Sequence, residues 1–205
     1  MKRIWEPCSE SSTDYRIFDA SARVNLDLLT PRDYDFIYSL ASRAGQGWPW
    51  HGLAATAENL AASLWDGVSE QRVVRLVSGR PIAVVALYDV QMHHQTASAR
   101  IYSVPSAAGQ AGLALEGMAI FLDMCLLRYR LRKVYFETTS DLVGQFGTAT
   151  KFLLTTEGHH RDRFYVDGRL CDMLILTLDR SRWFEFRDAL MRSIRAYDRS
   201  AVEEN

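Results

Sequence analysis

Apolar residues alternate with polar residues over 23–29, a pattern typical of a β-strand that is buried on one face, and several further short stretches rich in apolar residues also predict β-strands. A hairpin turn over 78–81 and a second turn over 92–96 are predicted to join three of these strands. Pro105 is expected to end the strand before it, because proline has no amide proton to donate to a sheet. The predicted strands cover 23–29, 72–77, 82–90, 97–104, 133–137, 164–166 and 170–178.

Helical spacing of apolar residues alternates with these strands. Thr30 and Thr56 are predicted to be N-caps, and Pro31 fits the first position of a helix. The predicted helices cover 31–42, 56–65, 113–130, 141–153 and 183–197. The resulting order is β, α, α, β, β, β, α, β, α, β, β, α. It predicts an α+β fold, a mixed and mostly antiparallel sheet with flanking helices, and it disfavours a doubly wound parallel sheet.

The composition narrows the class of protein. The chain has 205 residues, 48% of them hydrophobic, with 24 Lys and Arg against 25 Asp and Glu. This apolar content argues against disorder, and the balanced charge argues against a nucleic-acid partner. Three cysteines suggest neither a disulfide framework nor a zinc site. The most apolar run, 113–127, is too short and too charged for a membrane span, and the start of the chain has no signal-peptide core.

We therefore expect a soluble, cytoplasmic protein without a membrane partner. Its expected organisation is an N-terminal arm over 1–22, one domain over 23–183, and a C-terminal helix and tail over 184–205. The aromatic stripe of that last helix is expected to pack either on its own domain or on a second copy, as a homodimer.

A loop of small residues at 106–112 follows one predicted strand and leads into the longest predicted helix. Its short side chains leave the backbone open, and the N–H groups of a first helical turn have no partner within the helix. The helix dipole adds positive partial charge there. The loop is therefore either a phosphate or pyrophosphate site or a tight turn with close helix–sheet packing.

The sequence around this loop resembles the GNAT (GCN5-related N-acetyltransferase) superfamily, and most closely its branch that acetylates ribosomal-protein N-termini and small amines. The likeness covers about 23–183. It rests on a small-residue loop, a Glu one turn into the helix, an apolar helix with a late Asp, and a Leu-x-Lys-Val strand. The matching residues are Gly112, Ala114, Glu116, Asp123, Leu131, Lys133 and Val134.

The resemblance implies a GNAT-like fold with a splayed parallel strand pair. It also implies an acyl-CoA-dependent N-acyltransferase that uses acetyl-CoA, with no metal. The acceptor would be a primary amine of a small molecule or a protein N-terminus. The expected cofactor-binding residues are Ile101, Tyr102, Ser103 and Val104 along the strand, Gly109, Gln110, Ala111, Gly112, Leu113 and Ala114 at the loop, and Asp141.

Two positions depart from the family pattern. Gly109 stands where the family usually has Arg or Gln, and Ala149 stands where many members have a Tyr that protonates the leaving thiolate. These departures keep two alternatives open. One is a GNAT-fold enzyme that takes its donor from an acyl-carrier protein or catalyses decarboxylation. The other is a non-catalytic acyl-CoA-binding module.

Three residues are candidates for acid–base catalysis. Glu137 is the leading base, because partial burial on the splayed strand would raise the pKa of its carboxyl; the alternative is an ion pair with Arg132 or Lys151. His93 is a further candidate because histidine is the residue type most often used as a general base, but its turn position also fits an exposed residue. Tyr102 is either an acid or a substrate-shaping residue, and otherwise a half-buried strand residue.

The acceptor side is expected to include an aromatic loop. Trp48, Trp50 and His51 lie between the first two predicted helices, where two indoles would form a wall for an amine or pin the loop to the core. Tyr165 is a further substrate-binding candidate. Glu116 is expected to complement the start of its helix and nearby backbone donors.

Overall fold

The computed structural model describes residues 21, 23–42, 56–104, 111–146, 149–166 and 168–203. Its strands are β1 (Val24–Leu28), β2 (Val68–Leu76), β3 (Pro81–Gln91), β4 (Thr96–Ser103), β5 (Lys133–Thr139), β6 (Thr155–Val166) and β7 (Arg169–Asp179). Its helices are α1 (Tyr34–Ala41), α2 (Ala57–Ser63), α3 (Ala111–Arg128), α4 (Ala149–Phe152) and α5 (Arg180–Glu203), with 3₁₀ turns η1 (Pro31–Asp33) and η3 (Val143–Phe146).

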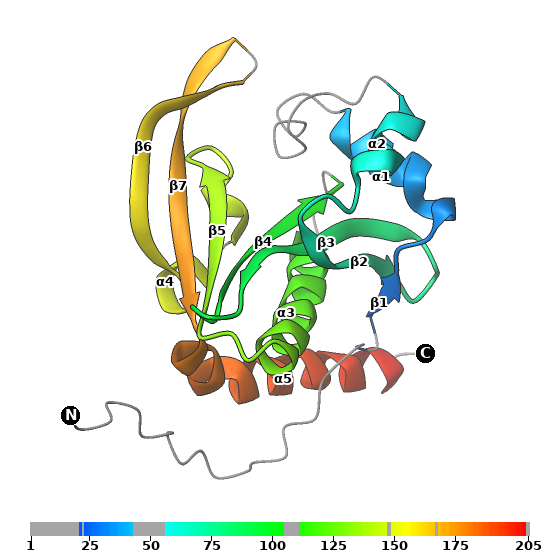
Figure 1. Ribbon diagram of the computed structural model, residues 1–205. Coiled ribbons are helices and arrows are strands. Elements are labelled where there is room, and N and C mark those ends of the chain that lie inside the picture. The colour runs from blue at the N-terminus through cyan, green and yellow to red at the C-terminus, as the bar shows by residue number, and fades with distance from the viewer. Residues whose placement is uncertain are drawn as a thin grey trace, which may run out of the picture.

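The strands form one seven-stranded sheet in the order β1-β2-β3-β4-β5-β7-β6 (Figure 1). Neighbouring strands run antiparallel except for β4 and β5, which are parallel. Helix α3 makes the crossover between this pair, as a parallel connection requires. The predicted fold class, a mostly antiparallel mixed sheet with one parallel pair and flanking helices, is confirmed.

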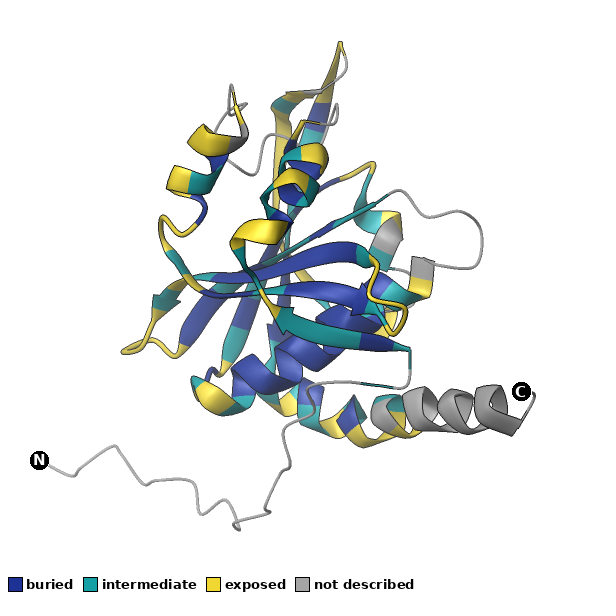
Figure 2. Ribbon diagram, turned by 90° about the vertical axis from the view of Figure 1, so that its right-hand side faces the viewer, coloured by how far each residue is buried: buried dark blue, intermediate teal, exposed yellow. Residues whose placement is uncertain are grey.

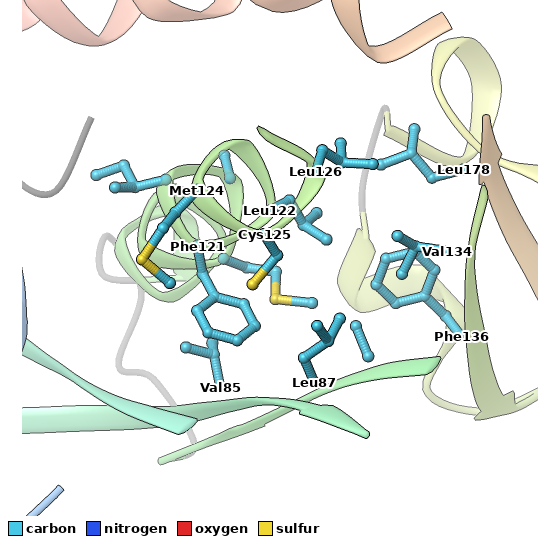
Figure 3. Close-up of a cluster of buried hydrophobic side chains, with 14 of the residues drawn as sticks. Val85, Leu87, Phe121, Leu122, Met124, Cys125, Leu126, Val134, Phe136 and Leu178 are labelled. Carbon is cyan, nitrogen blue, oxygen red and sulfur yellow. The ribbon is translucent and has the colours of Figure 1, made fainter. Parts of the chain in front are cut away.

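Helices cover both faces of the sheet. The buried side chains of α3 form the main core with one face of β3 and β5, where Phe121 and Cys125 point toward Val85 and Leu87 (Figure 3). On the opposite face α1 and α2 form a second apolar cluster that includes Tyr102 of β4. Figure 2 shows the buried residues concentrated in α3 and the central strands.

Two contacts fix α3 in the middle of the molecule. A Cβ at Gly117 would lie 2.4 Å from a methyl carbon of Val74, so the helix approaches β2 as closely as a glycine permits. On its other side Asp123 accepts a hydrogen bond from the Trp183 indole at 3.0 Å and pairs with Arg187. Both partners lie on α5, which begins at Arg180 and therefore runs through the expected boundary at 183/184.

The predicted N-caps are found. The Thr56 hydroxyl accepts from the Asn59 amide at 3.2 Å. At the first helix Thr30 is the N-cap, and the Asp33 carboxylate accepts from both the Thr30 amide and the Thr30 hydroxyl at 3.0 Å. The helix after Pro31 starts as the 3₁₀ turn η1, one detail that the capping pattern did not distinguish.

Four elements differ clearly from their predicted extents. Helix α5 runs from Arg180 to Glu203 rather than over 183–197, and the other three differ for physical reasons. Strand β2 starts at Val68 rather than at 72, because Glu70 and Gln71 are buried polar residues with partners and hide the alternation. Strand β6 starts at Thr155 rather than at 164, because a sheet edge tolerates polar residues on both faces. The helix predicted over 141–153 is divided into η3 and α4, consistent with the low helix propensity of glycine.

None of the helices in the described ranges is long and apolar enough to cross a membrane.

Candidate functional site

The parallel strands β4 and β5 pair only at their N-terminal ends. Their register pairs are Thr96↔Lys133, Ala97↔Val134 and Ser98↔Tyr135, although both strands continue beyond them. Figure 1 shows the two strands diverging from this point. On its other side β4 stays paired with β3 as far as Ser103. The backbone from Ala99 to Ser103 therefore has no strand partner on the β5 side.

This open backbone edge leads toward the start of α3. The Val104 amide donates to Ile82 O at 2.9 Å and holds the end of β4 against β3. The first turn of α3 contains four predicted cofactor-binding residues, Ala111, Gly112, Leu113 and Ala114. Gly112 is exposed, and nothing lies within 4 Å of a Cβ added there. The first N–H groups of a helix have no partner within the helix, and a small, exposed residue beside them leaves room for a phosphate. The predicted residues Gly109 and Gln110 lie outside the described ranges.

An ion pair spans the space between the diverging strands. Arg100 Nη2 of β4 lies 3.2 Å from Glu137 Oε2 of β5, with the two side chains 14% and 37% exposed. The Arg100 guanidinium also lies over the Tyr88 ring of β3, 4.4 Å from its centroid. All three side chains are on the sheet face opposite α3, because β3 and β4 residues that pair in register share a face.

Tyr102 lies two residues beyond Arg100 on the same face, among the side chains of α1 and α2. Burial raises the pKa of its hydroxyl far above the usual range, and the nearby Arg100 opposes this rise only in part. Burial likewise raises the pKa of the Tyr88 hydroxyl. Both phenols therefore keep their protons at neutral pH, so each hydroxyl can donate a hydrogen bond as well as accept one.

Glu137 does not pair with Arg132 or Lys151, the two partners that the sequence suggested for it. Its carboxylate pairs with Arg100, whereas the Arg132 guanidinium donates to His94 O at 2.9 Å. Arg100 is absent from the sequence-based candidates. The alternation of residues in β4 could have indicated Arg100, because Ser98, Arg100 and Tyr102 lie on one face of the strand and its two alanines lie on the other.

The other described candidates lie away from this ion pair. His93 is exposed in the turn between β3 and β4, at the closed end of the strand pair. That turn precedes Thr96, which is six residues or about 20 Å from Tyr102 along β4. Tyr165 is 75% exposed on β6 and pairs with Leu170, about 16 Å along β7 from Ile175, the residue opposite Glu137.

Asp141 follows the end of β5 on the open side of the strand pair, and its carboxylate accepts from the Cys171 thiol with Sγ and Oδ2 3.6 Å apart. The aromatic candidates Trp48, Trp50 and His51 lie outside the described ranges. Glu116 differs from its expected role. Its buried carboxylate pairs with the Arg23 side chain and accepts from the Ser21 hydroxyl at 2.5 Å, because the second turn of α3 faces the start of β1.

Within the part of the chain that the structure describes, no group of three or more His, Cys, Asp or Glu side chains is arranged to hold a metal ion.

A mixed sheet with a separated parallel pair, followed by a helix that starts beside the separation, is the arrangement that the resemblance to the GNAT superfamily implies. No protein-family profile matches the sequence, and no curated protein does. Solved structures do match. Spermidine N-acetyltransferase from Vibrio cholerae, in complex with CoA and spermine, superposes with a TM-score of 0.67 at 19% identity. The match covers 80% of this chain and 99% of that chain.

Two further structures of this kind match equally well. A chimera of the Vibrio cholerae enzyme and hSSAT has a TM-score of 0.66 at 21% identity, covering 79% of this chain and 98% of that chain. The Vibrio cholerae enzyme with manganese ions has a TM-score of 0.66 at 20% identity, covering 80% and 96%. The chain described here therefore has the GNAT fold.

Proposed function

We propose that this protein is an acyl-CoA-dependent N-acyltransferase that transfers an acetyl or related acyl group to a primary amine. The observation that carries the proposal is the unpaired backbone edge of β4, which leads toward the N-terminus of α3. An extended amide-containing arm can hydrogen-bond to such an edge in the manner of an added strand. A pyrophosphate can accept from the free N–H groups of the helix.

The residues present fit coenzyme A as the donor. The β4 edge from Ala99 through Val104 would hold the pantetheine arm, and the first turn of α3 from Ala111 would hold the pyrophosphate. When bound, the cofactor supplies a thioester carbonyl that an amine can attack. The match to a structure solved with CoA supports this assignment.

Glu137 is the best-placed proton acceptor for this chemistry. Its carboxylate lies in the opening between β4 and β5, partly exposed and held by Arg100. The acceptor nitrogen would have to lose its ammonium proton for its lone pair to bond to the carbonyl carbon. The carbon–sulfur bond would then break, and the CoA thiolate would leave with that electron pair and take a proton from solvent. A carboxylate within hydrogen-bond reach can take the ammonium proton, and Arg100 fixes the carboxylate in place.

For the acceptor, the proposal names classes of primary amine and no single compound. The structural matches include an enzyme solved with spermine, and this favours a small-molecule amine over a protein N-terminus. The sequence resemblance to the branch that acetylates ribosomal-protein N-termini supports the second acceptor class. An acyl-carrier protein as donor is the alternative that the departures at Gly109 and Ala149 suggest.

Thiol release measures the proposed reaction directly. Purified protein is incubated with acetyl-CoA and a panel containing butylamine, putrescine, spermidine and an N-terminal peptide, with acyl-carrier protein as a second donor. We expect amine-dependent release of CoA thiol and an acetylated amine by mass spectrometry. CoA binding without release for any amine would refute the catalytic proposal, and release from acyl-carrier protein alone would replace the donor.

A further inference from the structure

We propose that Tyr88 of β3 is a positioning residue for the acyl transfer, because its ring holds the Arg100 guanidinium where that group also holds the Glu137 carboxylate. This inference rests on the proposed function and adds a residue to the same site. It follows from a row of side chains that crosses three neighbouring strands, β3, β4 and β5 (Figure 1). The row lies where β4 and β5 separate, since Ser98 pairs with Tyr88 and is also the last β4 residue that pairs with β5.

Arg100 of β4 joins the two outer members of this row. On one side its guanidinium carbon lies 4.4 Å from the centroid of the Tyr88 ring, within the range in which a cation is attracted to an aromatic face. On the other side Arg100 Nη2 lies 3.2 Å from Glu137 Oε2. One planar guanidinium can make both contacts, because its face stacks on the ring while its N–H groups point outward in the plane. Tyr88 therefore acts on Glu137 through Arg100.

The Arg100 head group stays charged in this position. Burial would lower the pKa of Arg100, but Tyr102, Tyr88 and Glu137 beside it together raise it. The side chain is only 14% exposed, so solvent contributes little to its placement. A long arginine side chain loses rotamer freedom when its head group is held, and a second contact at the ring restricts it more than the ion pair does by itself.

The backbone around Tyr88 is irregular on both sides. Immediately after it, β3 has two residues, Asp89 and Val90, where β4 has only Ala97, and Asp89 adopts a left-handed φ of 50°. On the other side β2 has one residue, Ser69, that no residue of β3 matches in register. Such β-bulges bend a strand and redirect its side chains, and they are frequent beside active sites. The two bulges therefore place a local bend of the sheet at Tyr88.

Positioning matters because the Glu137 side chain is 37% exposed at the edge of the opening. A partly exposed carboxylate that nothing holds samples several rotamers, and only some of these lie within hydrogen-bond reach of an attacking amine. Without the Tyr88 ring, Arg100 gains freedom to move, and Glu137 spends less time within reach. The expected loss is therefore in the chemical step and not in the binding of acetyl-CoA.

Two substitutions separate the ring of Tyr88 from its hydroxyl. Y88M removes the aromatic face and fills most of the space. We expect its kcat for thiol release, with the best acceptor of the amine panel, to fall about tenfold while KM for acetyl-CoA stays within about twofold of wild type. Y88F keeps the ring and should keep at least about half of the wild-type kcat. A loss of about tenfold in Y88F would overturn the inference, because the hydroxyl would then be the group that matters.

A double variant tests whether Tyr88 acts through Arg100. R100Q should by itself lower kcat by about tenfold. Y88M/R100Q should be no slower than R100Q, because the ring has then lost the group that it holds. Additive losses in the double variant would overturn the inference, as would an unchanged kcat in R100Q. If circular dichroism shows that Y88M does not fold, R100Q and Y88F still decide the test.

Y129M is the matched control, because the Arg128 guanidinium lies over the Tyr129 ring at 5.8 Å, at the C-terminal end of α3 and away from the proposed cofactor site. It should leave kcat within about twofold of wild type. An equal loss in Y129M and Y88M would overturn the inference, since removal of any stacked tyrosine would then have the same effect. Thiol release by the wild-type protein with unchanged kcat in Y88M overturns this inference alone. No release with any amine overturns the proposed function and this inference together.

Discussion

Asp123 and Arg187 form an ion pair in which the side chains are 0% and 6% exposed. Arg187 Nη2 lies 2.9 Å from Asp123 Oδ2, and the Trp183 indole N–H donates to the other carboxylate oxygen. The pair joins the middle of α3 to α5, 64 residues later in the chain. It therefore fixes the C-terminal helix on the helix that starts beside the proposed cofactor site.

Asp123→Asn should lower the free energy of unfolding by about 3 kcal/mol or more, because it leaves the Arg187 guanidinium buried without a counter-charge. Urea denaturation followed by circular dichroism measures the change. Asp188→Asn is the control, since Asp188 is 69% exposed and contacts the same arginine at 3.6 Å. A loss below about 1 kcal/mol in Asp123→Asn would show that the pair does not hold α5 in solution.

Gly117→Ala should destabilise the protein by about 1–3 kcal/mol. The added Cβ would lie 2.4 and 2.7 Å from the two methyl carbons of Val74, so α3 would have to move away from β2. Gly144→Ala is the matched control, because nothing lies within 4 Å of a Cβ at that position. If thermal unfolding gives equal midpoints for the two variants, the close approach of α3 to β2 is wrong.

Glu137→Gln should reduce the rate of acyl transfer by about 100-fold or more, since an amide cannot accept the proton of the attacking amine. The rate is measured as thiol release at saturating acetyl-CoA, from about pH 6 to about pH 9. Glu157→Gln removes a carboxylate of similar exposure from β6, where it pairs with Lys133, and should leave the rate within about twofold. An unchanged rate in Glu137→Gln at every pH would remove this residue from the mechanism.

Asp33→Asn should lower stability by about 2 kcal/mol at neutral pH. Burial alone would raise the pKa of Asp33, but hydrogen bonds from Thr30 and the Arg75 guanidinium together hold it below its ordinary value of 3.8. A carboxyl with a depressed pKa stabilises the fold above its unfolded pKa, and this contribution is lost as the pH falls through the folded pKa.

The difference between the wild-type protein and Asp33→Asn should therefore be constant near neutral pH and should shrink below about pH 4. Urea midpoints measured across this range test it, with Asp66→Asn, an exposed turn residue, as the control. A difference that grows toward acid pH would contradict the assigned direction of the pKa shift.

Much of the fold was predictable because its signals are local. A continuous apolar run defined β3, alternation defined β4, and the threonine caps placed the starts of the first two helices. The small-residue loop before α3 also pointed to the side of the fold where the cofactor is proposed to bind. Prediction failed where polar residues are buried or lie on a sheet edge. Glu70 and Gln71 in β2 and the polar half of β6 carry no alternation, since ion pairs, a backbone partner or solvent satisfy them instead.

The candidate site divides in the same way. The sequence by itself determined that a strand, a small-residue loop and a helix follow one another, and that Tyr102 and Glu137 stand on the strands before and after that helix. Only the tertiary structure decided that Arg100 reaches Glu137 across the opening, that Tyr102 is buried beneath α1 and α2, and that His93 and Tyr165 lie elsewhere. The physical reason is that alternation gives the face of each residue, whereas β4 and β5 separate only after their third register pair, which depends on how the whole sheet is packed.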